Sequence, residues 1–349
     1  MNIVLYHKNC IDGFMSAVLM YLYFKEIGEL NKTGFVAVNY NEPMPDITDK
    51  HVYIVDFSYP KDVIVDAATR AKSITMLDHH LSAAQQWGGY IDESFKSGLP
   101  VHCQFNIKIA EHQSGAGLTY NWVMRNILYN AGNFNNTIFV NDDDDRILDV
   151  VKAVQDRDLW IFKRRNTKKI HEALSILPRT FEAWEEFLVK SPYDDFKEKI
   201  KAAGYYLEVK EKLAIEYASK HELVDFLGYR VPIVNCPANF ASSVGEILYQ
   251  GYPFSVTYCL DSKIIYCSLR SNSEDGIDVS ELAVMFLGGG HKKSSGCKLP
   301  TELFQYLLHG QLEYIRRRIN PSYNYELEPT PDKGLLLKSP ICDAYLTTK

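Results

Sequence analysis

The sequence predicts an α/β protein in which a parallel-sheet domain is joined by a long helix to a smaller α/β domain. Three observations support this fold class. Short apolar runs in the first half alternate with segments of helical period, as in a parallel sheet that helices cover on both faces. Residues 191–222 are rich in Lys, Glu and Ala, which is typical of a largely solvated connecting helix. A length of 349 residues also exceeds that of one typical domain.

The first half contains four predicted strands with helices between them. Each strand is a short apolar run without helical period, which is typical of strands buried on both faces. In chain order the runs are NIVLYH, GFVAVNY, HVYIVDFS and SITMLDHH. Apolar residues at helical spacing predict helices over residues 14–24, in KDVIVDAATRAK, after Ser114 as an N-cap, and in VVKAVQDRDLW.

The second half begins with a strand and a hairpin. YRVPIVN is the predicted strand, and FSVTYCLDSKIIYCSLRS is predicted to form two strands joined by a turn at "DS". A helix in DVSELAVMFL and the glycine-rich run GGGHKKSSG follow. After TELFQYLLHGQLEYIRRRI, the tail has no clear period.

The composition is that of an ordinary globular protein. Hydrophobic residues make up 46% and charged residues 23%, and a formal net charge of −6 argues against a general nucleic-acid coat. Seven cysteines without a CxxC pair form neither a disulfide framework nor a zinc pattern. We find no signal-peptide core and no apolar run of membrane-spanning length, so we expect a soluble cytoplasmic protein without a membrane partner. A homodimer is compatible with the pattern but is not required by it.

Residues of metal-ligand type end three of the predicted strands. They are His7, Asp56, Asp78, His79 and His80. The carboxyl ends of parallel strands meet at one edge of a sheet, so we expect these side chains and Asp12 to converge there, together with Asp156 if its helix crosses that edge. Carboxylates and imidazoles this crowded need cations between them. Mixed Asp/His ligands suit Mn²⁺, Fe²⁺, Co²⁺ or Zn²⁺ better than Ca²⁺.

A second candidate site lies in the second half of the chain. Three consecutive glycines at 288–290 allow backbone N–H groups to approach phosphate oxygens, and the histidine that follows adds a donor. Arg270, at the end of a predicted strand, can hold a phosphate through two hydrogen bonds. The candidate substrate-binding residues are Arg270, Ser271, Gly289, Gly290 and His291.

Six stretches of the chain, in order, resemble the motifs of a known superfamily. YHKNCIDGF, VDFSY, LDHH and QDRDLW are similar to the four motifs of the DHH phosphoesterases, and CSLRSN and GGGHKKSSG are similar to their associated C-terminal domain. The resemblance covers about residues 2–300. The superfamily includes RecJ exonuclease, nano-RNases, phosphatases of 3'-phosphoadenosine 5'-phosphate, cyclic-dinucleotide phosphodiesterases and family II pyrophosphatases. The second domain favours the branches that act on nucleotides or oligonucleotides.

The resemblance implies a site with two Mn²⁺ ions, for which Mg²⁺, Co²⁺ or Fe²⁺ could substitute. The implied metal ligands are His7 for one ion, Asp12, His79 and Asp156 for the other, and Asp56 as a catalytic bridge between both. His80 would lie near the scissile phosphate, with Asp78 orienting the histidine pair. Asp158 would be a salt-bridge or cap residue beside Arg157.

Cys10 is a departure from the first motif. That motif normally has an aspartate two residues before the Asp of "DG", and the spacing of the histidine is also changed here. A thiolate at this position could ligate a softer metal. Alternatively, Cys10 merely packs and leaves one ion with more water, or the substitution weakens catalysis.

The implied activity is hydrolysis of phosphodiester bonds in short oligonucleotides or in linear or cyclic dinucleotides, by water activated between two metal ions. The predicted domains are a catalytic domain at 1–190, a helical linker at 191–222, a substrate-binding domain at 223–303, and a C-terminal helix and tail at 304–349. Two alternatives remain. One is a phosphatase of nucleoside bisphosphates or polyphosphate, and the other is a nucleotide-binding regulatory protein with weak turnover.

Overall fold

The computed structural model of the chain describes residues 1–8, 10–40, 42–87, 103–130, 138–139, 145–272, 277–321, 326–330 and 334–338. The chain divides into two units, Met1–Leu207 and Glu208–Lys349. Of the predicted C-terminal tail, the part beyond residue 321 is described only at 326–330 and 334–338.

The first unit is built on a five-stranded sheet with the order β2-β1-β3-β4-β5, in which every neighbouring pair is parallel. The strands are β1 (Asn2–His7), β2 (Thr33–Val38), β3 (His51–Val55), β4 (Ser73–Asp78) and β5 (Gln104–Ile109). The first four correspond to the predicted apolar runs, and the parallel α/β fold class is confirmed. The sequence pattern did not predict β5, because polar residues alternate along this edge strand.

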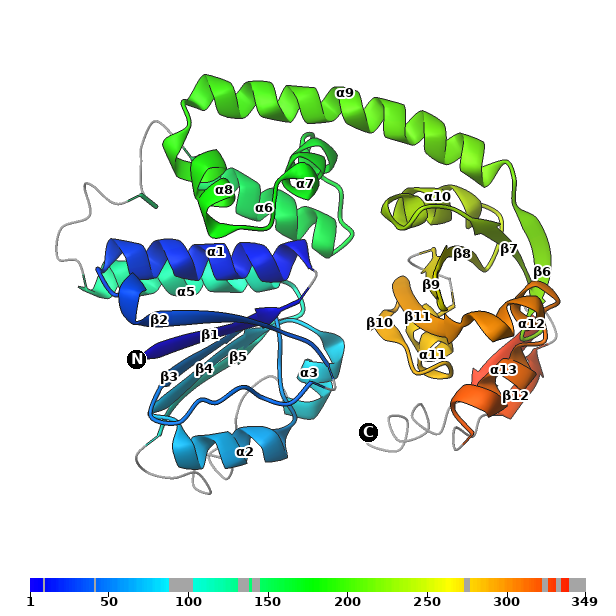
Figure 1. The fold of residues 1–349 in the computed structure, drawn as a ribbon, viewed down its shortest axis with the longest axis horizontal. Helices are drawn as coiled ribbons and strands as arrows, with labels where there is room; N and C mark the ends of the chain where they lie inside the picture. The colour runs from blue at the N-terminus through cyan, green and yellow to red at the C-terminus, as the bar shows by residue number, and fades with distance from the viewer. Residues whose placement is uncertain are drawn as a thin grey trace. The chain divides into compact units, whose positions relative to one another are not determined.

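Helices cover both faces of this sheet (Figure 1). On one face lie α1 (Ile11–Glu26) and α5 (Gly115–Asn130), with α6 (Arg146–Asp158) packed against both. On the other lie α2 (Lys61–Arg70) and α3 (Leu81–Trp87). The buried residues of the first face include Val4, Val18, Val55, Leu77, Leu118 and Val150. Those of the second include Leu5, Ile54, Ile64, Ala67 and Met76. Ser114 caps α5 as expected, since its Oγ accepts from the N–H of Gly117 at 3.2 Å.

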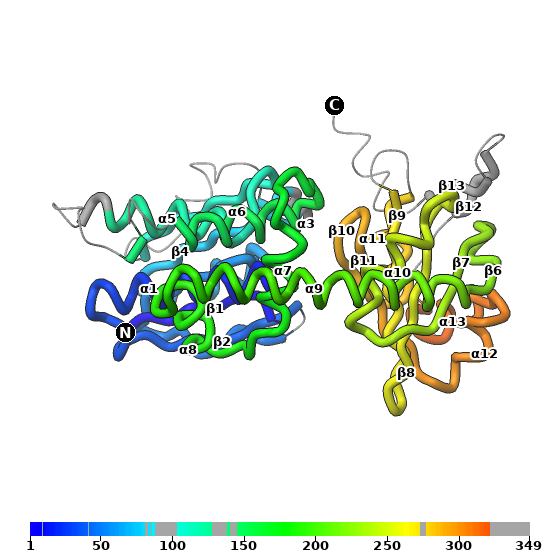
Figure 2. The backbone as a smooth tube through the Cα atoms, turned by 90° about the horizontal axis from the view of Figure 1, so that it is seen from above, coloured from blue at the N-terminus to red at the C-terminus, as the bar shows by residue number. Residues whose placement is uncertain are grey.

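The first unit ends in a group of helices around α6. They are α7 (Thr167–Ile176), α8 (Phe181–Glu185) and a π-helical turn (Glu186–Lys190). The helix α9 (Tyr193–Ala218) falls within the range predicted for the connecting helix and continues unbroken through the boundary between the units (Figure 2). Among the helices of the described ranges, none combines the length and apolar character that crossing a membrane requires.

The second unit contains a mixed six-stranded sheet with the order β10-β11-β9-β8-β7-β6. Its strands are β6 (Glu222–Phe226), β7 (Tyr229–Asn235), β8 (Phe254–Asp261), β9 (Ile264–Ser271), β10 (Gly289–His291) and β11 (Ser294–Pro300). The predicted hairpin is confirmed, because β8 pairs with β9 in antiparallel register across Ser262, whose φ is 52°. The helices are α10 (Ala241–Leu248), α11 (Val279–Val284), α12 (Phe304–Leu308) and α13 (Leu312–Ile319), and a two-stranded pair β12 (Glu326–Thr330) and β13 (Gly334–Lys338) follows.

Candidate metal centre

The candidate site of the first unit lies where the strand order reverses. From β1 the chain adds β2 on one side of that strand and then β3, β4 and β5 on its other side, so the switch point lies between β1 and β3. In open α/β sheets, ligands bind outside the carboxyl ends of the strands at such a point. His7 is the last residue of β1, and Asp56 follows the last residue of β3. Asp78 ends β4 and is followed by His79 and His80. The topology therefore brings these five residues to one edge.

Asp56 is the central residue of this edge. Its side chain is fully buried, with Oδ1 3.1 Å from Nε2 of His79 and Oδ2 3.5 Å from Nδ1 of His7. Its backbone has a φ of 54°, in the left-handed region that an aspartate tolerates better than most residues. Sparsely populated conformations of this kind persist where the surrounding structure fixes them, and they concentrate at functional sites.

Two glycines leave room for the Asp56 carboxylate. A Cβ on Gly115 would lie 2.4 Å from the Cβ of Asp56 and 2.5 Å from its Oδ1. A Cβ on Gly13 would lie 2.5 Å from the carbonyl oxygen of His7 and 3.1 Å from Oδ2 of Asp56. Sequence reasoning did not identify Gly115 as part of the site. Its signal was the small-residue run SGAG at the start of a predicted helix.

Asp12, in the first turn of α1, is held by the N-terminus of α5. Its Oδ2 accepts a hydrogen bond from the N–H of Gly115 at 2.6 Å, and its Oδ1 accepts from that of Ala116 at 2.9 Å. These are free donors of a helix N-terminus, where a carboxylate is stabilised. The same Oδ2 lies 3.6 Å from Nε2 of His79. Asp12 is therefore both buried and fixed in direction.

The structure places Asp158 at this edge, and it does not place Asp156 there. Oδ2 of Asp158 lies 3.3 Å from Nε2 of His79, so that His79 faces three carboxylates. Asp158 was expected to form a salt bridge or a cap beside Arg157, and its described ion pair is with His79, so it also belongs to this edge. The Arg157 guanidinium lies 4.5 Å from the centre of the Trp160 ring.

The carboxylate of Asp156 binds the segment after α6 and not the edge of the sheet, so the metal-ligand position expected for it is corrected. Its oxygens accept hydrogen bonds from the N–H groups of Lys163 and Arg164 at 2.9 and 3.0 Å and from the hydroxyl of Thr167. These bonds fix the turn between α6 and α7. They also hold the pKa of Asp156 below its usual value, although burial raises it. This aspartate organises the loop that follows the helix carrying Asp158.

Asp78 orients the histidine pair. Its Oδ1 accepts from the backbone N–H of His79 at 2.8 Å and lies 2.7 Å from Nδ1 of His80. With Nδ1 of His80 engaged in this way, Nε2 is the ring nitrogen on its other side. The rings of His80 and His7 are 5.3 Å apart, centre to centre. Both histidines therefore border the same side of Asp56.

The carboxylates of the site are buried close to one another, and this proximity shifts their pKa values. Burial and the nearby Asp56 and Asp158 raise the pKa of Asp12 well above its usual value. Burial raises the pKa of Asp158 as well, and the charge of Asp56 adds to it. Burial alone would lower the pKa of His79, but the three carboxylates around it raise it to about 10. A bound cation would relieve this repulsion.

The donor set fits divalent metal ions. The ligand atoms of His7, Asp56 and His80 lie within 4.8 Å of one another, and so do those of Asp12, Asp56 and His79. Both groups share Asp56. Several buried atoms of the site form no hydrogen bond with any described residue, namely His7 Nδ1, Asp56 Oδ1, Asp56 Oδ2 and Asp158 Oδ2. Buried polar atoms without partners are rare, and a pair of ions would satisfy them.

Cys10 lies at the margin of the site. It occupies the N-cap position of α1, and its carbonyl accepts a hydrogen bond from Arg179. Burial raises the pKa of its thiol, and the charges of Asp56, Asp158 and Asp12 raise it further. Cys10 belongs to neither of the two ligand groups found among the described residues.

The predicted substrate-binding residues of the second unit lie on adjacent strands. Ser294 of β11 pairs with Arg270 of β9 on one side and with His291 of β10 on the other. Arg270 is buried, and its guanidinium donates to the hydroxyls of Ser268 and Ser242, both at 2.8 Å. These bonds fix the guanidinium in one orientation.

The glycine-rich run of the second unit contains β10 and the turn to β11, and β10 is an edge strand of the sheet. Gly289 has open space where a Cβ would be. Gly290 has a φ of 142° and would bring a Cβ within 2.5 Å of the carbonyl oxygen of Ser294, so only glycine fits there. Ser271 is buried, and its hydroxyl donates to the carbonyl of Lys292 at 3.3 Å. Its role in the structure is therefore to hold β9 to the turn after β10.

Comparisons with known proteins bear on the fold. No family model matches the chain. An uncharacterized protein of Acanthamoeba polyphaga mimivirus is 25% identical over 315 residues, which cover 84% of this chain. The chain spans 66% of the length of that viral relative.

Two solved structures superpose on most of the chain. A DHH domain from a ribosomal-protein family superposes with a TM-score of 0.51 at 13% identity, over 90% of this chain and 86% of that one. The exonuclease RecJ bound to manganese gives a TM-score of 0.51 at 10% identity, over 90% of each chain. At these identities the likeness shows the fold. The chain therefore has the two-unit α/β fold of DHH proteins, as its six motifs predicted.

Proposed function

We propose that this DHH-fold chain is a divalent-metal-dependent phosphoesterase that hydrolyses phosphodiester bonds in short oligonucleotides or in linear or cyclic dinucleotides. The observation that carries the proposal is the position of Asp56. One buried carboxylate, whose two oxygens face His79 and His7, belongs to both groups of potential metal ligands. A carboxylate shared in this way is the bridging ligand of a two-metal site.

Two ions would be held as follows. His7 and Asp56 would ligate one ion on the side that His80 borders, and Asp12, Asp56, His79 and Asp158 would ligate the other. In this arrangement Asp158 would take the place that the resemblance implied for Asp156. Bound divalent ions lower the pKa of water into the neutral range and neutralise the charge on a phosphate. Manganese is the metal we propose, because mixed carboxylate and imidazole ligands suit it and the RecJ structure of the same fold contains it.

The chain's own groups would position the substrate. Asp78 holds Nδ1 of His80, so Nε2 of that ring can donate to a phosphate oxygen. Asp12 is held by the N-terminus of α5, which fixes its carboxylate before any ligand binds. Preorganisation of this kind lowers the cost of reaching the transition state.

A nucleotide substrate is supported by the second unit. Arg270, Ser294 and His291 lie in one register line across three strands, and Arg270 is held rigidly by two serines. A fixed guanidinium on β9 and a histidine on β10, with Ser294 of β11 between them, suit a phosphate or a nucleotide terminus. We propose that this unit binds the part of the substrate distant from the scissile bond.

The decisive experiment compares the natural chain with Asp56→Asn. The natural chain should hydrolyse a dinucleotide or a five-residue RNA in Mn²⁺ and bind two equivalents of Mn²⁺ by calorimetry. Asp56→Asn should lower turnover about 100-fold or more, since the loss of groups that only orient ligands already costs 10–100-fold. Unchanged turnover in this variant would refute the proposal. A panel that adds cyclic dinucleotides, nucleoside bisphosphates and polyphosphate identifies the substrate, and turnover confined to the last two would replace the diesterase with a phosphatase.

A further inference from the structure

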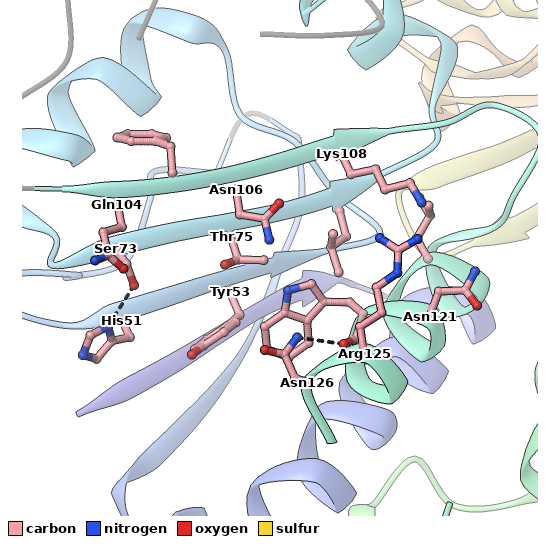
Figure 3. Close-up of a pocket in the computed structure, with 14 residues that line it drawn as sticks. His51, Tyr53, Ser73, Thr75, Gln104, Asn106, Lys108, Asn121, Arg125 and Asn126 are labelled. Carbon is pink, nitrogen blue, oxygen red and sulfur yellow. Dashed lines mark hydrogen bonds between the residues drawn. The ribbon is translucent and has the colours of Figure 1, made fainter. Parts of the chain in front are cut away.

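A hollow of about 420 Å³ lies in the first unit between the sheet and α5 (Figure 3). Strands β3, β4 and β5 form one wall, and residues 118–126 of α5 form the other. None of the residues that line the hollow belongs to the metal centre. Its volume falls in the range of sites for small molecules. The hollow is therefore a separate candidate site.

The sheet face that forms one wall is polar, which is unusual for a parallel sheet. Alternate residues of β5, Gln104, Asn106 and Lys108, point into the hollow, and the neighbouring strand β4 adds Ser73 and Thr75 (Figure 3). The opposite face of the same strands packs in an apolar core. Parallel strands are normally apolar on both faces, because helices cover them. A face with this many donors and acceptors cannot be covered by an apolar helix without a large desolvation cost.

Two cations gather at one end of the hollow. Lys108 of β5 and Arg125 of α5 extend from opposite walls toward the same end (Figure 3). Neither forms a hydrogen bond or an ion pair with any described residue, and the described residues that line the hollow include no aspartate or glutamate. Two like charges that converge, with no acidic side chain beside them among the described residues, favour the binding of an anion. A guanidinium with an adjacent ammonium suits a phosphate in particular.

The rest of the lining suits a nucleobase. The amides of Gln104 and Asn106 provide both donors and acceptors, which is what pairing with the edge of a base requires. Tyr53 and Trp122 form an aromatic part of the wall, and their ring centres lie 5.5 Å apart in an edge-to-face arrangement. This combination of a cationic end, amides and aromatic rings matches a phosphate attached to a nucleoside.

We propose that this hollow binds a nucleoside monophosphate, with Lys108 and Arg125 on the phosphate and with Gln104 and Asn106 on the base. The site is distinct from the metal centre and needs no divalent ion. The proposal does not depend on the proposed reaction, because it rests on different residues of the same unit.

The test is calorimetric titration of the full chain, in the presence of EDTA, with AMP, GMP, CMP and UMP. At least one should bind saturably with a Kd at or below about 1 mM, which is about −4 kcal/mol. The double variant Lys108→Gln/Arg125→Gln should weaken that binding about 10-fold or more, and Asn106→Ala should weaken it independently. Lys61→Gln/Arg70→Gln makes the same charge change on α2, on the other side of the sheet, and should leave binding unchanged. Thermal unfolding checks that each variant is folded.

Asp56→Asn separates the two sites. The variant should keep the nucleotide affinity of the natural chain in EDTA, because its substitution lies in the metal centre. Loss of binding in Asp56→Asn would place the ligand at the metal centre and overturn the proposal. Absence of saturable binding by all four nucleotides, or binding of inorganic phosphate as tight as that of the best nucleotide, would also overturn it.

Discussion

Oδ2 of Asp158 lies 3.3 Å from Nε2 of His79, so the last residue of α6 meets the residue that follows β4. Two residues earlier, Asp156 is directed to a different part of the molecule and accepts three hydrogen bonds from the segment before α7 and from its first residue. One aspartate therefore belongs to the candidate metal centre and the other to the support of the loop beside it.

This pair gives a matched test. Asp158→Asn should weaken Mn²⁺ binding and turnover about 10-fold or more, with a small effect on thermal stability, because it removes a charge that faces the proposed ion. Asp156→Asn should leave Mn²⁺ affinity nearly unchanged but lower the free energy of unfolding by about 1–3 kcal/mol, since three donors lose a charged acceptor. Calorimetric Mn²⁺ titration and denaturant unfolding measure both. The reverse pattern would return the ligand role to Asp156.

Gly115 should be intolerant of any side chain. In Gly115→Ala the new Cβ would overlap Asp56, so either the carboxylate or the start of α5 must move. A misplacement of about 1 Å in a catalytic group can cost about 100-fold in rate, and we expect a loss of this order together with weaker Mn²⁺ binding. Gly34→Ala is the control, because nothing lies within 4 Å of a Cβ there. Activity and Mn²⁺ affinity equal to those of the control would show that Asp56 does not need the space.

Asp78 should act through His80. Asp78→Asn keeps the size of the side chain but removes the charge that holds Nδ1 of His80. We expect kcat to fall about 10–100-fold while Mn²⁺ affinity changes little, because Asp78 touches the histidines and not the proposed ions. In the double variant Asp78→Asn/His80→Gln, the loss should be no greater than in His80→Gln alone. Additive losses would mean that Asp78 acts independently of His80.

We expect Glu185 to contribute to the stability of the fold in a pH-dependent way. This carboxylate is 4% exposed and pairs with Lys25 of α1 and, at 3.0 Å, with Lys190. Burial raises its pKa, but the two lysines outweigh burial and hold that pKa below its usual value of 4.5. A carboxylate with a depressed pKa in the folded state stabilises the fold above its unfolded pKa, and this stabilisation is lost as pH falls through the folded pKa.

Glu185→Gln should therefore lower the free energy of unfolding by about 1 kcal/mol at neutral pH, a value kept small because both lysine side chains are about half exposed to solvent. The difference from the natural chain should shrink as the pH falls below about 4. Denaturant unfolding at both pH values measures it. Glu186→Gln, at the exposed neighbouring residue, is the control and should show little change at either pH. A difference for Glu185→Gln that did not vary with pH would exclude the ion pairs as its cause.

Local pattern alone predicted most of the first unit. The runs that became β1, β2, β3 and β4 are apolar and short, and the residues at their ends stand at the carboxyl edge of the sheet wherever such strands lie parallel. The parallel direction of the strands is by itself enough to predict that His7, Asp56 and His79 lie close together. The strand β5 was missed because its polar residues alternate, and the hollow that those residues line could not be foreseen for the same reason.

The sequence by itself determined the fold class, the strands and the aspartates and histidines that meet at their ends. The tertiary structure decided which aspartate of QDRDLW reaches that edge. Residues two apart in a helix are separated by a rotation of about 200° about its axis, so Asp156 and Asp158 point to nearly opposite sides and face different surroundings. Which of them faces the sheet depends on the rotation of α6 about its own axis, and this rotation is fixed when Val150, Val151 and Val154 are buried against α1 and α5. That rotation is set by packing between segments distant in the chain, which no local pattern contains.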